Sequence, residues 1–289
     1  MNRTARKNET TLPTRRELFA FAGLGFLGAA GLFDSVANAA DNTKTNAAQP
    51  AHDAMSSLPD MKMTGNEVIG MVLYPGFTAL DLIGPHFFFG GMMGAKLHLI
   101  TTERTLAPVP SDLGLAIAPT VTLADAPKDI DLLFVGGGSR GTRDAMLRND
   151  VVDFLADRGS RAQYVTSVCT GSLLLGQAGF LKGKRATSHW ATRELLPLFG
   201  ATSVDARVVV DDNVITGAGV TAGLDFAITV VSALRGKGYA QGLMLQAEYH
   251  PEPPLPGGTI QSTDPQVAKM MREMFAPSVS GFREAARKI

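Results

Sequence analysis

The chain has 289 residues, and 45% of them are hydrophobic, which is enough to form the core of one large domain or two small ones. Its 27 basic residues balance its 27 acidic residues, and no basic run or stripe stands out along the sequence. This composition is not typical of a nucleic-acid-binding protein, so nucleic acid is excluded as an expected partner.

The first 39 residues have the pattern of an export signal. Arg15 and Arg16 precede a moderately apolar, glycine-rich stretch over residues 18–32, and small residues at 37–39 suit a cleavage site. The alternative is an uncleaved membrane anchor, but the apolar stretch has about 15 residues where roughly 20 are needed to span a bilayer. We therefore expect a twin-arginine signal, a periplasmic or exported mature protein, and no stable membrane insertion after cleavage.

The rest of the chain divides into three parts. Residues 40–65 are polar and lack hydrophobic periodicity, which predicts a flexible spacer. Residues 66–262 alternate short apolar runs with helical patterns, which predicts a single folded domain. Residues 263–289 are expected to form a helical tail, with one helix over residues 265–275.

The alternating pattern of the central part predicts an α/β fold, with a mostly parallel sheet flanked by helices. Short apolar runs predict strands over residues 67–74, 96–101, 132–135, 164–168, 206–210 and 214–216. Helical patterns cover residues 79–89, 144–157, 170–178 and 221–234. Functional residues of such a fold are expected at the carboxyl ends of the strands.

Cys169 lies where a predicted strand passes directly into a predicted helix. Small residues occupy the second position before it, Ser167, and the second position after it, Gly171, as in a sharp nucleophile elbow. The free N–H groups of the new helix would favour the thiolate. Cys169 is the only cysteine, so it forms no internal disulfide. The alternative is a small, buried and inert side chain.

The other candidate site residues carry weaker signals. Asp81 lies among apolar neighbours after the first strand, and it is either a surface acid or a buried general acid with a raised pKa. The glycines at 136–138 lack the spacing of a phosphate loop, but a glycine N–H there could join the N–H of Thr170 in an anion hole. His189 taken alone indicates a structural role. The five histidines lack metal-ligand spacing, so no metal is expected.

Taken together, residues 68–259 resemble the ThiJ/PfpI superfamily, and within it the isonitrile hydratase group. Five stretches in the same order carry the resemblance: LDLIGP at 80–85, SVCTGS at 167–172, LKGKRATSHW at 181–190, ITGAGVTAGLD at 215–225 and EYHPEPP at 248–254. The resemblance implies a catalytic domain with a class I glutamine amidotransferase-like, flavodoxin-like sandwich, and a homodimer.

The resemblance also assigns roles to residues of this chain. It makes Cys169 the nucleophile and Asp81 the acid, and it implicates Thr170 in catalysis. It gives the oxyanion position to the backbone of Gly138, and it leaves His189 as an auxiliary residue. No cofactor is implied.

The expected function is that of a lyase acting on a small molecule. It adds water to an isonitrile, giving an N-substituted formamide through a thioimidate on Cys169. The alternatives are a glyoxalase or deglycase, against which Asp81 in place of the usual Glu argues, and a non-catalytic periplasmic redox or ligand sensor. One departure concerns the substrate pocket: Phe87 occupies a position where the family often has an acidic residue.

Overall fold

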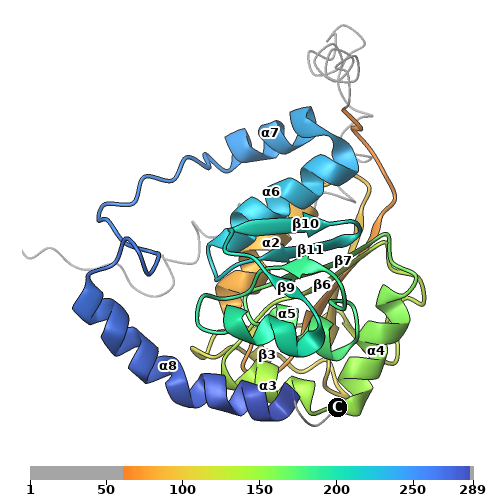
Figure 1. Ribbon diagram of the computed structural model, residues 1–289. Helices are drawn as coiled ribbons and strands as arrows, with labels where there is room; N and C mark the ends of the chain where they lie inside the picture. The colour runs from red at the N-terminus through yellow and green to blue at the C-terminus, as the bar shows by residue number, and fades with distance from the viewer. Residues whose placement is uncertain (1–60, 287–289) are drawn as a thin grey trace, which may run out of the picture. The chain divides into compact units, whose positions relative to one another are not determined.

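A seven-stranded sheet forms the centre of the computed structural model, which describes residues 61–286 (Figure 1). The predicted signal and most of the predicted spacer lie outside the described residues. The strand order is β10-β11-β7-β6-β1-β2-β5, and within this sheet only β10, at one edge, runs antiparallel to its neighbour. The strands are β1 Val68–Leu73, β2 Lys96–Thr101, β5 Val121–Thr122, β6 Leu132–Val135, β7 Tyr164–Val168, β10 Val208–Asp211 and β11 Val214–Gly217.

Helices cover both faces of the sheet (Figure 1). One layer contains α2 Ala79–Gly90, α6 Ala222–Arg235 and α7 Lys237–Gln246. The other contains α3 Arg140–Met146, α4 Asn149–Gly159, α5 Gly171–Gln177 and the 3₁₀ helix η1 Arg193–Phe199. The last helix, α8 Pro265–Ala286, packs on α3 and η1. None of the helices in the described part of the chain is long and apolar enough to cross a membrane.

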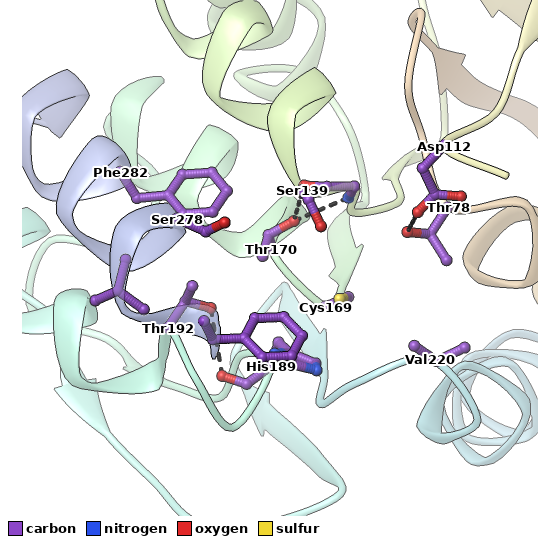
Figure 2. Close-up of a pocket in the computed structure, with 13 residues that line it drawn as sticks. Thr78, Asp112, Ser139, Cys169, Thr170, His189, Thr192, Val220, Ser278 and Phe282 are labelled. Carbon is purple, nitrogen blue, oxygen red and sulfur yellow. Dashed lines mark hydrogen bonds between the residues drawn. The ribbon is translucent and has the colours of Figure 1, made fainter. Parts of the chain in front are cut away.

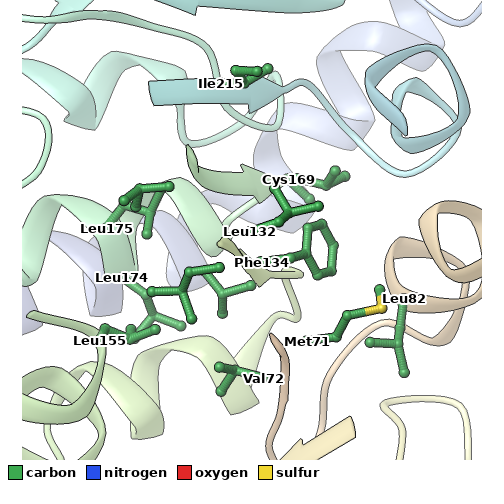
Figure 3. Packing of buried hydrophobic residues seen from close by; sticks show 14 of the residues in the cluster. Met71, Val72, Leu82, Leu132, Phe134, Leu155, Cys169, Leu174, Leu175 and Ile215 are labelled. Carbon is green, nitrogen blue, oxygen red and sulfur yellow. The ribbon is translucent and has the colours of Figure 1, made fainter. Parts of the chain in front are cut away.

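The sheet is buried on both faces, which explains the continuous apolar runs of its central strands. All four residues of β6 are buried, as are the last five of β1 and the last four of β7. Phe134 of β6 and Met71 of β1 lie in the main hydrophobic cluster (Figure 3). Cys169 lies at the edge of this cluster, directly after β7.

The predicted helix over residues 144–157 is wrong, because the structure has two helices there, α3 and α4. The chain is extended at Arg148, between the two helices. Its guanidinium group donates hydrogen bonds to the carbonyl of Thr102 at 2.6 Å and to the carboxylate of Glu103 at 2.8 Å. These contacts fix the break between α3 and α4 to the end of β2. Hydrophobic periodicity does not predict such a break, because it carries no information about contacts between distant residues.

The tail helix is longer than predicted, since α8 continues from residue 275 to Ala286 through Pro277. An internal proline costs a helix about 3 kcal/mol. Burial of Phe282 and Ala285, each 2% exposed, offsets much of that cost, since a buried aromatic side chain contributes about 2–3 kcal/mol. Four two-residue strands in small sheets were also not predicted: β3 Val109–Pro110, β4 Ala116–Ile117, β8 Arg185–Ala186 and β9 Thr202–Ser203.

The order in which successive strands are added to the sheet reverses between β1 and β6. These strands are neighbours, yet β1 leads into α2 on one face and β6 leads into α3 on the other. The connections diverge at the carboxyl ends of the two strands, which opens a crevice there. The segments after β1, β6, β7 and β11 all reach this crevice, and they carry most of the residues predicted for the site.

Candidate active site

Cys169 occupies a strained elbow between β7 and α5. Its backbone has φ +61°, a left-handed conformation that is uncommon for a residue other than glycine. The Cys169 N–H donates to the carbonyls of Gly217 at 3.1 Å and Ala218 at 2.8 Å, which fixes the turn to the end of β11. A Cβ atom at Gly171 would lie 2.4 Å from the Val135 carbonyl oxygen. The elbow therefore requires a glycine two residues after the cysteine.

The sulfur of Cys169 is buried, with the residue only 6% exposed. Burial raises the pKa of the thiol well above its usual range, and the negative charge of Asp81 raises it further. Backbone N–H groups of Thr170 and Val220 act in the opposite direction. The prediction of a favoured thiolate is therefore wrong for the resting site, because α5 has only seven residues and its free N–H groups do not outweigh burial.

Val220 was missed by the sequence analysis. It follows β11 in a glycine-rich turn, with φ +36°, and its N–H, like that of Thr170, lowers the pKa of the Cys169 thiol. Among the described residues, neither of these two N–H groups donates to another backbone carbonyl. The signal in the sequence was the segment Gly217-Ala218-Gly219, a turn that allows the backbone to approach another group closely.

Asp81 lies in the first turn of α2 and is fully buried. Its Oδ2 accepts a hydrogen bond from the Gly137 N–H at 2.8 Å, while Oδ1 has no partner in the described part of the chain. Burial raises the pKa of Asp81 from 3.8 to about 7; the hydrogen bond from Gly137 and interaction with the nearby Cys169 thiol oppose the rise, and the charge of Asp112 adds to it. The structure thus brings Asp81 and Cys169 together, with the raised pKa that a proton-transferring carboxyl requires.

The Thr170 hydroxyl is bound to the glycine-rich loop after β6 (Figure 2). The N–H of Gly138 donates to Thr170 Oγ1 at 2.9 Å, and Thr170 Oγ1 lies 2.9 Å from the Gly138 carbonyl oxygen. Because the Gly138 N–H is already paired, the expected anion hole containing it is not present. The free backbone donors beside the sulfur are those of Thr170 and Val220.

A chain of buried hydroxyl groups extends from Thr170 into the protein. Thr142 Oγ1 lies 2.8 Å from Thr170 Oγ1 and 2.8 Å from the Tyr74 hydroxyl. Tyr74, 1% exposed, donates in turn to the Gly136 carbonyl at 2.8 Å. The chain therefore ends on the same loop that carries Gly138, so it holds the Thr170 side chain from both sides.

His189 forms part of the wall of the site. Its ring centroid lies 5.4 Å from that of Trp190 and 5.5 Å from that of Phe275 on α8. Burial lowers the pKa of His189 to about 4, and the positive charge of Arg193 contributes, so the ring is neutral at neutral pH. Within the described residues its side chain forms no hydrogen bond to Cys169 or Asp81.

These residues surround a cavity of about 190 Å³ beside the sulfur (Figure 2). Its lining comprises Thr78, Asp112, Gly138, Ser139, Cys169, Thr170, His189, Thr192, Val220, Phe275, Ser278, Val279 and Phe282. The last four belong to α8, which sequence reasoning did not connect with the site. The sequence spacing of these four residues places them on one face of a helix, but it does not predict which part of the protein packs against that face. Phe87 is not among the lining residues and is 44% exposed.

Within residues 61–286, no group of three His, Cys, Asp or Glu side chains could hold a metal ion. The chemistry available here is that of the Cys169 thiol, two backbone N–H donors, and the buried carboxyl group of Asp81, which neighbours the thiol and does not itself line the cavity. This set can form a covalent bond to an electrophilic carbon and move protons at that carbon.

Comparisons with known proteins show the family to which this chain is similar. The DJ-1/PfpI family model matches residues 67–233. An isonitrile hydratase from Pseudomonas putida is 44% identical over 211 residues, covering 73% of this chain and 91% of that protein. The crystal structure of a ThiJ/PfpI family protein from Pseudomonas syringae has a TM-score of 0.78 and 44% identity, over 87% of this chain and 99% of that one.

A more distant structure supports the fold alone. Drosophila melanogaster DJ-1beta has a TM-score of 0.57 at 22% identity, over 64% of this chain and 98% of that one. These matches confirm the resemblance predicted from the sequence and the α/β fold with its mostly parallel sheet. This chain is a homologue of isonitrile hydratase, and it belongs to the DJ-1/PfpI family.

Proposed function

We propose that this protein is a lyase that hydrates isonitriles to N-substituted formamides, with Cys169 as its nucleophile. The proposal is supported by the 44% identity to the isonitrile hydratase of Pseudomonas putida. The observation that carries it is the buried contact between the Cys169 thiol and Asp81, a carboxyl group with a pKa of about 7. Hydration of an isonitrile needs one nucleophile and one group that moves protons, and this pair provides both.

The first step forms the covalent intermediate. Near neutral pH the proton of the pair lies on sulfur, because the pKa of the thiol is higher than that of Asp81. Asp81 accepts the thiol proton as the sulfur attacks the terminal carbon of R–N≡C, and it then delivers that proton to the same carbon. The S–H bond is broken, the S–C and C–H bonds are formed, and the product is the thioimidate R–N=CH–S–Cys169.

The second step releases the product. Water adds to the thioimidate carbon while Asp81 accepts one of its protons and passes that proton to the nitrogen. The C–S bond then breaks as the C=O bond forms, the remaining hydroxyl proton returns through Asp81 to the sulfur, and the formamide R–NH–CHO leaves. The N–H groups of Thr170 and Val220 stabilise negative charge on sulfur as it departs. The Thr170 hydroxyl orients the water, and Gly138 holds that hydroxyl in place. His189 lines the cavity as an uncharged side chain in this scheme and transfers no proton.

The test is formamide production from a panel of isocyanides by the purified mature protein. Turnover should be lost in Cys169→Ala and Cys169→Ser, and intact-mass spectrometry of the wild type should detect an adduct on its single cysteine. Near wild-type turnover in either variant would overturn the proposed mechanism. Methylglyoxal, tested in parallel, distinguishes the glyoxalase alternative.

The sensor alternative has less support. Cysteines that report oxidation are accessible and have a low pKa. Cys169 is 6% exposed and its pKa is raised, so slow oxidation is expected. Export through the twin-arginine signal and assembly as a homodimer remain part of the proposal; cell fractionation and sedimentation of the purified protein test them.

A further inference from the structure

The outer wall of the catalytic cavity comes from α8, at the far end of the sequence. Phe275, Val279 and Phe282 lie on one face of this helix and line the cavity beside Cys169. Helix α8 begins more than thirty residues after the match to the family model ends, at residue 233. The wall is therefore not part of the catalytic elbow, and it can differ between relatives that keep the same chemistry.

The wall is uncharged and mostly apolar, with Ser278 as its only polar side chain among the α8 residues that line the cavity. Phe275 stacks at 5.5 Å on His189, whose low pKa keeps it neutral, and at 5.4 Å on Trp190. Phe282 is 2% exposed. No Lys or Arg lines the cavity in the described part of the chain, and its single carboxylate, Asp112, is bound by the Thr78 hydroxyl at 2.6 Å. A negatively charged substituent would find no counter-ion here, whereas an apolar one would be buried.

The volume limits the size of that substituent. A buried apolar cavity of about 150 Å³ accommodates one benzene molecule. The cavity here is about 190 Å³, which is enough for a single ring and the reactive carbon. A second ring exceeds this volume, and Phe275 and Phe282 are among the side chains that line it.

We propose that α8 is the selectivity element of this site, and that Phe275 sets the upper size limit for the group on the reactive carbon. This inference rests on the proposed function for its choice of substrate, but the steric limit is a property of the cavity itself.

Phe275 is the residue to change, because it is half-buried and distant from the sheet. Residues 247–264, which connect α7 to α8, are mostly exposed, so this connecting segment contributes few packing contacts. Phe275→Ala enlarges the cavity, and Phe275→Leu is a milder change that keeps the helix face apolar. Met274→Ala is the matched control, since Met274 is the adjacent residue, is 60% exposed and does not line the cavity.

The first measurement compares kcat/KM for a one-ring and a two-ring isocyanide. Phe275→Ala should raise the two-ring to one-ring ratio by about tenfold or more, since a change of a few carbon atoms in an apolar pocket alters discrimination by 10–200-fold. Phe275→Leu should move the ratio in the same direction, and Met274→Ala should leave it unchanged. An unchanged ratio in both Phe275 variants, with melting temperatures near that of the wild type, would overturn the inference.

The second measurement does not require turnover. Cys169 is the only cysteine in the chain, so alkylation by iodoacetamide and by a bulky aromatic maleimide reports on this cavity alone. Phe275→Ala should accelerate the maleimide more than iodoacetamide. If the wild type hydrates no isocyanide but this ratio rises, the proposed function fails and the steric role of α8 stands. If the ratio does not rise, the steric role fails whatever the activity.

Discussion

Asp81 lies beside Cys169, and each of the two groups changes the proton affinity of the other. Interaction with the thiol lowers the pKa of Asp81 against the larger effect of burial, and the charge of Asp81 raises the pKa of the thiol. Above about pH 7, where Asp81 is ionised, the pair holds one proton that either group can carry during the reaction. The contact joins the segment after β1 to the segment after β7.

The pH dependence of turnover follows from this coupling. Asp81 must be ionised to accept the thiol proton, so kcat/KM should rise as the pH increases through about 7. The charge of Asp112 raises the pKa of Asp81, so Asp112→Asn should move this limb to lower pH. A pH profile of kcat/KM for both proteins tests the prediction. A limb that does not move, or that moves to higher pH in the variant, would contradict it.

Removing the carboxylate should separate thiol reactivity from catalysis. Asp81→Asn eliminates the negative charge that raises the pKa of Cys169, so that pKa should fall. Iodoacetamide should then react faster with the variant than with the wild type near neutral pH, because more of the thiol is ionised. Formamide production should be lost, since amide side chains do not transfer protons. Slower alkylation of the variant would show that Asp81 does not raise the thiol pKa.

Asp81 should also destabilise the fold at alkaline pH. Its pKa is raised from 3.8 to about 7 by folding, so the native state binds the proton more tightly. Stability is therefore unaffected below about pH 4, is lost as the pH rises to about 7, and stays lower above it. Asp81→Asn should raise the free energy of unfolding at about pH 8, by up to about 4 kcal/mol, and much less at about pH 4. Urea denaturation at both pH values measures the difference; an equal effect at both would refute the assignment.

The chain of buried hydroxyl groups should affect catalysis by positioning the Thr170 side chain. Thr142→Val removes the hydroxyl between Thr170 and Tyr74 without changing the volume much. Loss of one such hydrogen bond should reduce kcat roughly threefold to tenfold with little change in KM, and Thr142→Ser should restore it.

The control for this prediction is Thr166→Val. Thr166 is equally buried, and its hydroxyl donates at 2.9 Å to the Leu133 carbonyl, so it is not part of the chain of hydroxyl groups. Steady-state kinetics of the three variants separates positioning from general destabilisation. Equal losses of kcat in Thr142→Val and Thr166→Val would show that the chain of hydroxyl groups has no specific role in catalysis.

Two glycine substitutions should have opposite effects on stability. In Gly171→Ala the new methyl group meets the Val135 carbonyl oxygen at 2.4 Å, so the elbow must shift, at a cost of about 1–3 kcal/mol. Gly242 lies in α7, is exposed and has open space around it, so Gly242→Ala should stabilise the protein by about 0.5–1 kcal/mol. Thermal unfolding compares them. A Gly171→Ala variant as stable as the wild type would mean that the elbow is looser than its geometry indicates.

The two central strands that lead into the site, β6 and β7, were predicted well because they are buried on both faces. Residues 132–135 and 164–168 were predicted as strands and match them, and residues 96–101 match β2. The break at Arg148 was missed because it depends on contacts with Thr102 and Glu103, far away in the sequence. Helix α8 was predicted too short because its continuation past Pro277 depends on burial against α3.

Local pattern alone determined the fold class and the position of the elbow at Cys169, whereas the family resemblance selected Asp81 as its partner. These features depend on neighbouring residues: apolar runs, a strand followed directly by a helix, and small residues on either side of the cysteine. Tertiary structure alone decided which groups surround the sulfur. It paired the Gly138 N–H with Thr170, brought Val220 to the sulfur, and placed α8 over the cavity. Burial and long-range contacts set the proton affinities and the walls of the site, because these depend on distance in space and not on distance along the chain.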